Sequence, residues 1–88
     1  MTLPRVTKQV NPVYPREALK DKAEAWVGVQ IVVLPTGGIG AARVISSTDW
    51  RFEAAALEAA RQWEFTPGTK DGQAASFLLF VELQFRAY

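Results

Sequence analysis

The sequence of 88 residues contains no cysteine and no histidine. These two absences exclude disulfide bonds, thiol catalysis, acid–base catalysis by imidazole and the common zinc sites. The carboxylates Glu53, Glu58 and Glu64 lie on or beside one predicted helix, but no nucleophile accompanies them, and acids on a helix face are usually solvated. We therefore predict that the chain is not an enzyme and holds no cofactor or metal.

An excess of charge of one sign is also lacking, since 10 Lys and Arg residues and 9 Asp and Glu residues leave a net charge of +1. Such a balance provides no strong field to hold nucleic acid or an anionic membrane surface. No apolar run approaches the ~20 residues that cross a bilayer, and no signal peptide is evident. If the native protein is secreted or anchored, we expect this chain to be one part of it.

The chain begins with a segment that shows no sustained periodicity. Residues 1–11 are predicted to form a flexible arm, and residues 12–88 a single small domain. Pro15 suits the first position of a helix, where its missing N–H is not needed, and residues 16–23 continue with good helix formers. We expect the domain to open with a short helix.

Strict alternation of period two follows over residues 25–34 and predicts a central strand. Residues 35–38 then supply a preset φ and two glycines that tolerate positive φ, so we predict a β-hairpin whose second strand spans residues 39–46. Gly40 indicates a bulge, because the parity of the apolar positions changes along that strand. The core face of the first strand is expected to carry Val27, Val29, Ile31 and Val33.

A cluster of capping residues predicts a second helix with Asp49 as its N-cap. Residues 65–68 end this helix, and residues 69–73 are predicted to form a polar loop. At 100° per residue, one apolar face of the helix is expected to pack on the sheet. That face holds Phe52, Ala56, Ala59, Ala60 and Trp63.

The longest alternating run spans residues 74–86 and predicts the last strand. Right-handed crossover places this strand beside the first hairpin strand and antiparallel to it. We therefore predict a two-layer α+β domain: a three-stranded antiparallel sheet in the order second, first, third, with two helices on one face. The last strand is then a sheet edge, and its free backbone groups can pair with another chain.

The order and spacing of several motifs resemble the C-terminal domain of TonB, the energy transducer of Gram-negative cell envelopes. The most specific is Trp-x-Phe-x-Pro at the end of the second helix. The opening motifs are Tyr14-Pro15 with Ala18, Pro35-Thr36-Gly37 after the first strand, and Ile39 through Val44 to Ser46-Ser47. The closing motifs are Phe52-Glu53, Ala55-Ala56, Ala59, Trp63-Glu64-Phe65-Thr66-Pro67 and Phe85.

Two positions depart from the family pattern: Ala25 stands where a glycine usually opens the first strand, and Gly28 is an unusual addition to it. The resemblance implies a periplasmic domain of a protein that an N-terminal helix anchors in the inner membrane and an ExbB/ExbD-type proton motor drives. The anchor and the Pro-rich spacer of the family are absent from this chain.

The resemblance also implies a partner: outer-membrane transporters, whose short N-terminal TonB box adds as a strand to the last strand of the domain. Residues just ahead of the Tyr-Pro motif also contact the receptor in the family. Carried over by position, the expected partner-binding residues are Asn11, Pro12, Tyr14, Pro15, Ser76, Phe77, Leu78, Leu79, Phe80, Val81 and Glu82.

Two other interpretations remain open. One is a TolA-like adaptor of the cell envelope. The other is a structural domain that self-associates, because a weak homodimer would use the apolar patch of Leu78 and Phe80 equally well. No nucleic acid is expected as a partner, since the sequence has no RNP-like run of glycine and aromatic residues.

Overall fold

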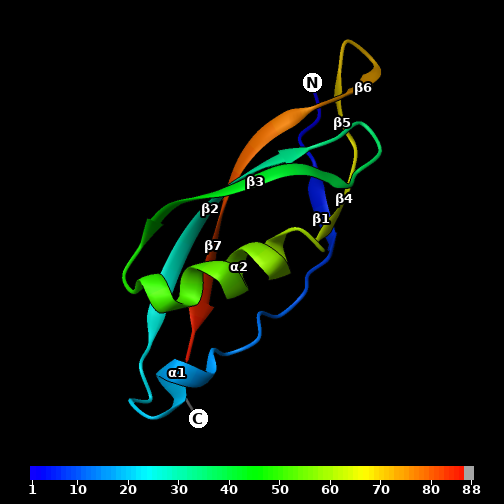
Figure 1. Ribbon diagram of the computed structural model, residues 1–88. Helices are drawn as coiled ribbons and strands as arrows, with labels where there is room; N and C mark the ends of the chain where they lie inside the picture. Colours follow the sequence, from blue (N-terminus) through cyan, green and yellow to red (C-terminus); the bar gives the residue numbers. More distant parts are fainter. Residues whose placement is uncertain (87–88) are drawn as a thin grey trace.

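The computed structural model describes residues 1–86, so the last two residues of the domain predicted over 12–88 lie outside the described part. No helix among these residues is long and apolar enough to cross a membrane. Figure 1 shows the elements in chain order: β1 (Arg5–Lys8), α1 (Arg16–Leu19), β2 (Ala25–Val33), β3 (Ile39–Ser47), the 3-10 helix η1 (Trp50–Phe52), α2 (Glu53–Ala60), β4 (Glu64–Thr66), β5 (Gly68–Lys70), β6 (Gln73–Ala75) and β7 (Phe77–Phe85).

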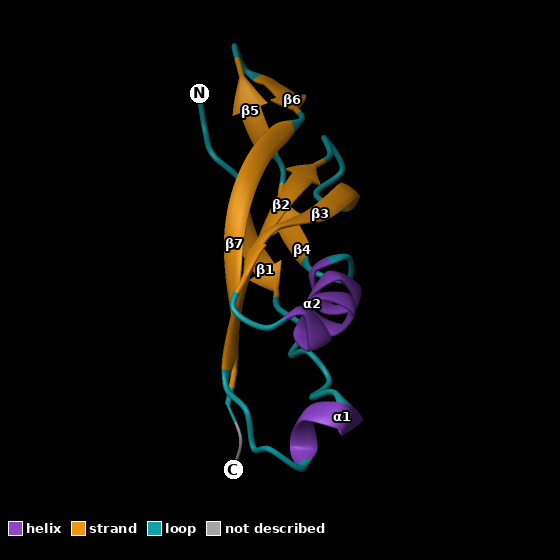
Figure 2. Cartoon of the chain, turned by 60° about the vertical axis from the view of Figure 1, so that its left-hand side comes forward, coloured by secondary structure: helices purple, strands orange, loops and turns teal. Residues whose placement is uncertain are grey.

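Strands β3, β2 and β7 form an antiparallel sheet in that order, with β2 in the centre. The predicted α+β fold class and the predicted strand order are therefore confirmed. Figure 2 shows the two layers, with α1 and α2 on the same side of the sheet. On that side α2 packs against β2 and β3, and we call the opposite side the open face.

The core lies between the sheet and α2. The predicted core face of β2 is completely buried at Val27, Val29, Ile31 and Val33, whereas Trp26 on the open face is 47% exposed. The predicted apolar helix face is buried as well. The small side chains of its alanines let the helix lie close to the sheet. Phe52 fills the space at the start of α2.

The two neighbours of β2 pair with it differently. The hairpin to β3 turns at Gly37 with a φ of 91°, and β3 contains two extra residues that have no partner on β2, Gly40 and Ile45. The bulge predicted at Gly40 is thereby confirmed, and the one at Ile45 was not predicted. In contrast, β7 pairs with β2 over nine consecutive residues without any shift of register.

The interpretation of residues 1–11 as an arm needs a correction, because residues 5–8 form strand β1, which pairs with β4. Thr2 also pairs with Thr69, and Trp63 Nε1 donates to the carbonyl oxygen of Val10 at 3.0 Å. All four residues of β1 are exposed. A strand so short and so exposed leaves no periodic signal in the sequence.

Two other predictions were wrong in detail. Helix α1 ends at Leu19 instead of continuing over residues 16–23, and Lys22 takes a φ of 48° in the turn that follows. The loop predicted over residues 69–73 is a hairpin of β5 and β6, turned by Asp71 and Gly72 with φ values of 53° and 77°. Asp-Gly with two positive φ values is typical of a tight hairpin turn.

The predicted N-cap is confirmed, since Asp49 Oδ1 accepts from the Arg51 N–H at 3.0 Å.

The substitution Phe52→Ala is expected to lower the free energy of unfolding by about 3–5 kcal/mol, because it leaves a cavity in the core. The Phe52 side chain is completely buried. Denaturant unfolding measures this loss. Trp50→Ala is the matched control: its side chain is 76% exposed, so its effect should stay within about 0.5 kcal/mol. Equal losses in the two variants would contradict this account of the core.

Candidate functional site

Strand β7 is an edge strand of the three-stranded sheet, and its outer edge has no partner strand in the described part of the chain. Because its pairing with β2 has no register shift, β7 is regular over nine residues, about 30 Å at ~3.3 Å per residue. Every second residue of such an edge presents its N–H and C=O groups outward. The edge therefore offers backbone groups at the spacing that an extended chain can pair with.

Strand β3 forms the opposite edge, and its bulges make it a poor template. The extra residues Gly40 and Ile45 interrupt the ladder with β2 near both ends of the strand. Bulges bend a strand, and they are one way in which sheets protect an edge from pairing. The sheet thus has one regular edge, and we place the candidate site there.

The side chains of β7 give this edge an apolar character on both faces. On the open face, Leu78 is 54% exposed and Phe80 is 64% exposed. On the helix side, Leu79 and Val81 are partly buried and pack against the core. An added strand would bring its alternate side chains beside apolar neighbours on both faces.

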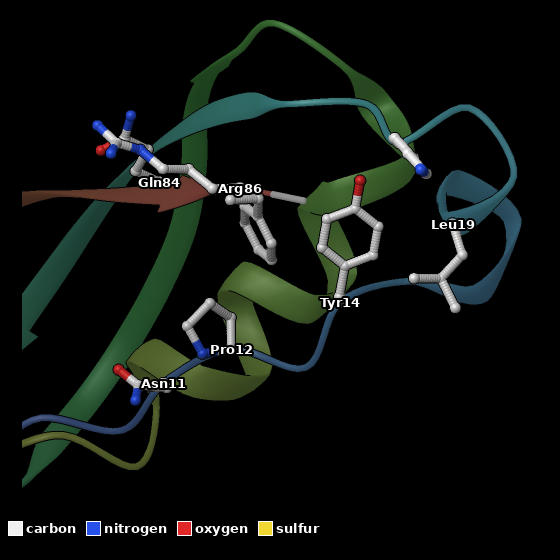
Figure 3. Close-up of a pocket in the computed structure, with 8 residues that line it drawn as sticks. Asn11, Pro12, Tyr14, Leu19, Gln84 and Arg86 are labelled. Atoms are coloured by element: carbon white, nitrogen blue, oxygen red, sulfur yellow. The ribbon is translucent and has the colours of Figure 1, made fainter. Parts of the chain in front are cut away.

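A cleft of about 660 Å³ lies at the end of β7. In Figure 3, Pro12 and Tyr14 lie on the segment that leads into α1, and Gln84 and Arg86 lie side by side at the end of the facing strand, β7, which Arg86 directly follows. The cleft therefore continues the line of the β7 edge. Its lining residues are Asn11, Pro12, Tyr14, Leu19, Lys22, Gln84, Phe85 and Arg86.

Three aromatic rings hold the two sides of the cleft together. The ring of Phe52 contacts Tyr14 edge-on with centroids 5.4 Å apart, and it contacts Phe85 at 4.7 Å in a tilted arrangement. The hydroxyl of Tyr14 donates to the carbonyl oxygen of Ala23. These contacts fix the segment before α1 against the end of β7, so the cleft is already formed in the free chain.

Arg51 fixes the turn that follows α1. Its guanidinium pairs with Asp49 at 2.7 Å and with Asp21 at 2.9 Å, and its Nη1 donates to the carbonyl oxygen of Glu17 at 3.3 Å. Hydrogen bonds from Arg51 hold the pKa of Asp49 below its ordinary value. The same side-chain hydrogen bond to Asp49, and a weaker contribution from the one to Asp21, raise the pKa of Arg51. The turn that carries the cleft residue Lys22 is thereby tied to η1.

The predicted partner-binding residues separate into two groups. Asn11, Pro12 and Tyr14 line the cleft, whereas Pro15 is the N-cap of α1 and does not line it. Residues 77–82 lie in β7, but Ser76 lies in the break between β6 and β7, outside the three-stranded sheet. The two groups meet through the last residues of β7, which the prediction left out.

Five lining residues of the cleft were missing from the predicted site: Leu19, Lys22, Gln84, Phe85 and Arg86. Some of them could have been predicted, because the last strand was expected to pair with the first strand of the hairpin. In the structure that pairing places Phe85 opposite Ala25, close to the residues that leave α1. Among residues 1–86, no cluster of acidic side chains could hold a metal ion.

These features define a class of protein: a small two-layer α+β domain in which one regular sheet edge leads into a cleft. Its fold matches the solution NMR structure of the Pseudomonas aeruginosa TonB CTD with a TM-score of 0.73 and 24% identity, over 94% of this chain and 85% of that chain. Protein TonB of Vibrio cholerae serotype O1 is 32% identical over 82 residues, which make up 92% of this chain and 34% of that protein.

A family profile described as Gram-negative bacterial TonB protein C-terminal matches residues 10–87. The chain therefore belongs to the TonB C-terminal family. This confirms the resemblance drawn from the motifs, and it agrees with the interpretation of the chain as a non-enzymatic interaction domain. The chain spans about a third of the length of the V. cholerae relative.

The substitution Asp49→Asn is expected to destabilise the fold more at about pH 6 than at about pH 2. Because the folded-state pKa of Asp49 is lowered, its ion pair stabilises the fold above the ordinary pKa of ~3.9, and this contribution is lost as the pH falls through the folded-state pKa. Asparagine retains the capping oxygen but not the charge. Denaturant unfolding of both proteins at both pH values measures the difference, and a difference independent of pH would contradict this role.

Proposed function

We propose that the β7 edge and the cleft at its end bind an extended peptide as an added β-strand. The observation that carries the proposal is the contrast between the two sheet edges, since β7 is regular over nine residues and β3 is interrupted by two bulges. In strand addition, backbone hydrogen bonds supply affinity, and neighbouring side chains supply selectivity.

Strand addition of this kind forms a weak and reversible complex with the peptide. Roughly five added backbone hydrogen bonds, each contributing about 0.5–1.5 kcal/mol, barely offset the association cost of about 4–15 kcal/mol. Side-chain contacts must therefore contribute. Leu78 and Phe80 provide them on the open face, where both are more than half exposed, and Tyr14 provides one in the cleft.

The partner in this proposal is the TonB box of an outer-membrane transporter. The domain acts in the periplasm as the receptor-binding end of a TonB-like energy transducer. An N-terminal helix anchors the full-length protein in the inner membrane, and an ExbB/ExbD-type motor supplies proton-driven force for active uptake, such as that of iron siderophores. Family membership and the position of the regular edge support this assignment.

Self-association is the second candidate function, and the open face is the observation that favours it. Trp26, Ile45, Leu78 and Phe80 are each 47% exposed or more on strands of one sheet. Exposed apolar patches of this kind mark protein interfaces. A homodimer formed through this face would compete with peptide binding at β7.

The substitution Phe80→Asp is expected to weaken binding of a TonB box peptide by about tenfold or more, because it removes an apolar contact beside the added strand. Fluorescence anisotropy with a labelled peptide measures the affinity, and an amide NMR spectrum verifies the fold. Trp50→Asp is the matched control, since this exposed aromatic residue belongs neither to β7 nor to the cleft and should leave affinity unchanged.

A second variant, Leu78→Pro, is also expected to weaken binding, because it removes an N–H that points away from β2: the even residues of β2 pair with β3, as Trp26 does with Thr48, so Leu79 opposite Ile31 pairs with β2 and its neighbour Leu78 faces outward. Unchanged affinity in both Phe80→Asp and folded Leu78→Pro would rule out the β7 edge as the site. Sedimentation of the peptide-free protein tests the second candidate. Concentration-dependent association that Phe80→Asp abolishes, together with absence of peptide binding, would favour the homodimer.

A further inference from the structure

The open face of the sheet carries a groove that runs across its strands from the end of β3 to the edge of β7. We call it the Gly28 groove, and the lining residues that matter here are Trp26, Gly28, Ile45, Ser46, Phe80 and Glu82. The register explains its course. Gly28 lies opposite Ser46 on β3 and opposite Glu82 on β7, so this row of the sheet holds little side-chain volume near its centre.

Two aromatic side chains stand on either side of this row. Trp26 lies two residues before Gly28 on β2, and Phe80 lies opposite Gln30, two residues after it. The side chains of Trp26 and Phe80 are 47% and 64% exposed. Along the strand direction, the row that contains Trp26 and the row that contains Phe80 are four residues apart, which is about 13 Å at ~3.3 Å per residue. Trp26 and Phe80 both line the groove, so a side chain that enters it lies beside both rings.

The absence of a side chain at position 28 creates the groove. A Cβ atom at this position would lie 2.6 Å from Ser46 Oγ and 3.6 Å from Ile45 Cγ1. Any larger residue would also project into the space between the aromatic rows.

The groove opens at the edge where the proposed peptide pairs. Neighbouring strands lie about 4.8 Å apart, so Gly28 lies about 10 Å from an added strand. A short side chain on that strand, placed beside Glu82, stays outside the groove. The long side chain of an arginine reaches across Glu82 toward the two rings.

Building on the proposed strand addition, we infer that the Gly28 groove takes an arginine side chain from the residue of the added strand that lies beside Glu82. Glu82 is the only charged residue of β7, and it takes part in none of the ion pairs among residues 1–86. Arg43, a cation two strands away, donates instead to Gln30 Oε1 at 2.7 Å. Opposite charges on adjacent strands attract each other, and a guanidinium stacks on aromatic rings.

Two series of peptides that differ by one charge test this inference. The host is a peptide of about eight alternating Val and Thr residues, and one arginine, or its uncharged isostere citrulline, is placed at each position in turn. At the one position of the host that lies beside Glu82, the arginine peptide is expected to bind about fivefold more tightly than the citrulline peptide. NMR shifts of β7 amides verify strand addition. In Glu82→Gln, the ratio of the two affinities should fall to about one.

A second variant tests the groove rather than the charge. Gly28→Val combined with Ser46→Ala fills the groove and removes the hydroxyl that an added Cβ would meet. The reference for this double variant is Ser46→Ala alone. We expect the double variant to lose the arginine preference and to bind the citrulline peptide with the affinity of its reference.

The possible outcomes separate the two proposals. If both peptides shift the β7 amides but bind equally at every position, the arginine site is overturned and strand addition stands. An arginine preference that survives both Glu82→Gln and the double variant also overturns the site. If no peptide of either series shifts the β7 amides, strand addition is overturned, and the arginine site with it.

Discussion

The unbroken pairing of β2 with β7 is the contact on which both the fold and the candidate site depend. The alternate residues of β2 that face α2 are completely buried, so this strand is held in place by the core. Its partner β7 is held on one side by nine paired residues, and on the other side it pairs with no strand among residues 1–86. The regular pairing that stabilises the sheet also keeps β7 free of bulges, and a regular edge is a template for an added strand.

The N-terminal segment determines what lies at the end of that edge. It is tied down at several places along its length: Thr2 pairs with Thr69, β1 pairs with β4, and Trp63 Nε1 donates to Val10. The contacts of Phe52 with Tyr14 and Phe85 then join this segment to the last residues of β7. In the proposed complex, a peptide that leaves the edge would therefore enter a formed cleft instead of open solvent.

Features that depend on burial were predictable from the sequence. Alternation on β2 identified its core face, the apolar stripe of the second helix identified the residues that cover the sheet, and handedness gave the strand order. The pairing of β1 with β4 could not be predicted, because Lys8 and Glu64 are far apart in the chain and both are exposed. The cleft was found only in part, since it depends on this long-range packing. The last strand and its place at the edge followed from the strand period and handedness, while the edge residues 76–82 were carried over from the family resemblance.

The central claim is that β7 binds a peptide along its free edge, and an NMR titration of labelled protein with a transporter N-terminal peptide tests it most directly. The account predicts shifts of backbone amides that concentrate in residues 77–86 and in residues 10–14, where the edge and the cleft lie. Amides of β3, at the bulged edge, should stay unchanged. Shifts concentrated in β3, or no shifts in β7 at saturating peptide, would contradict the account.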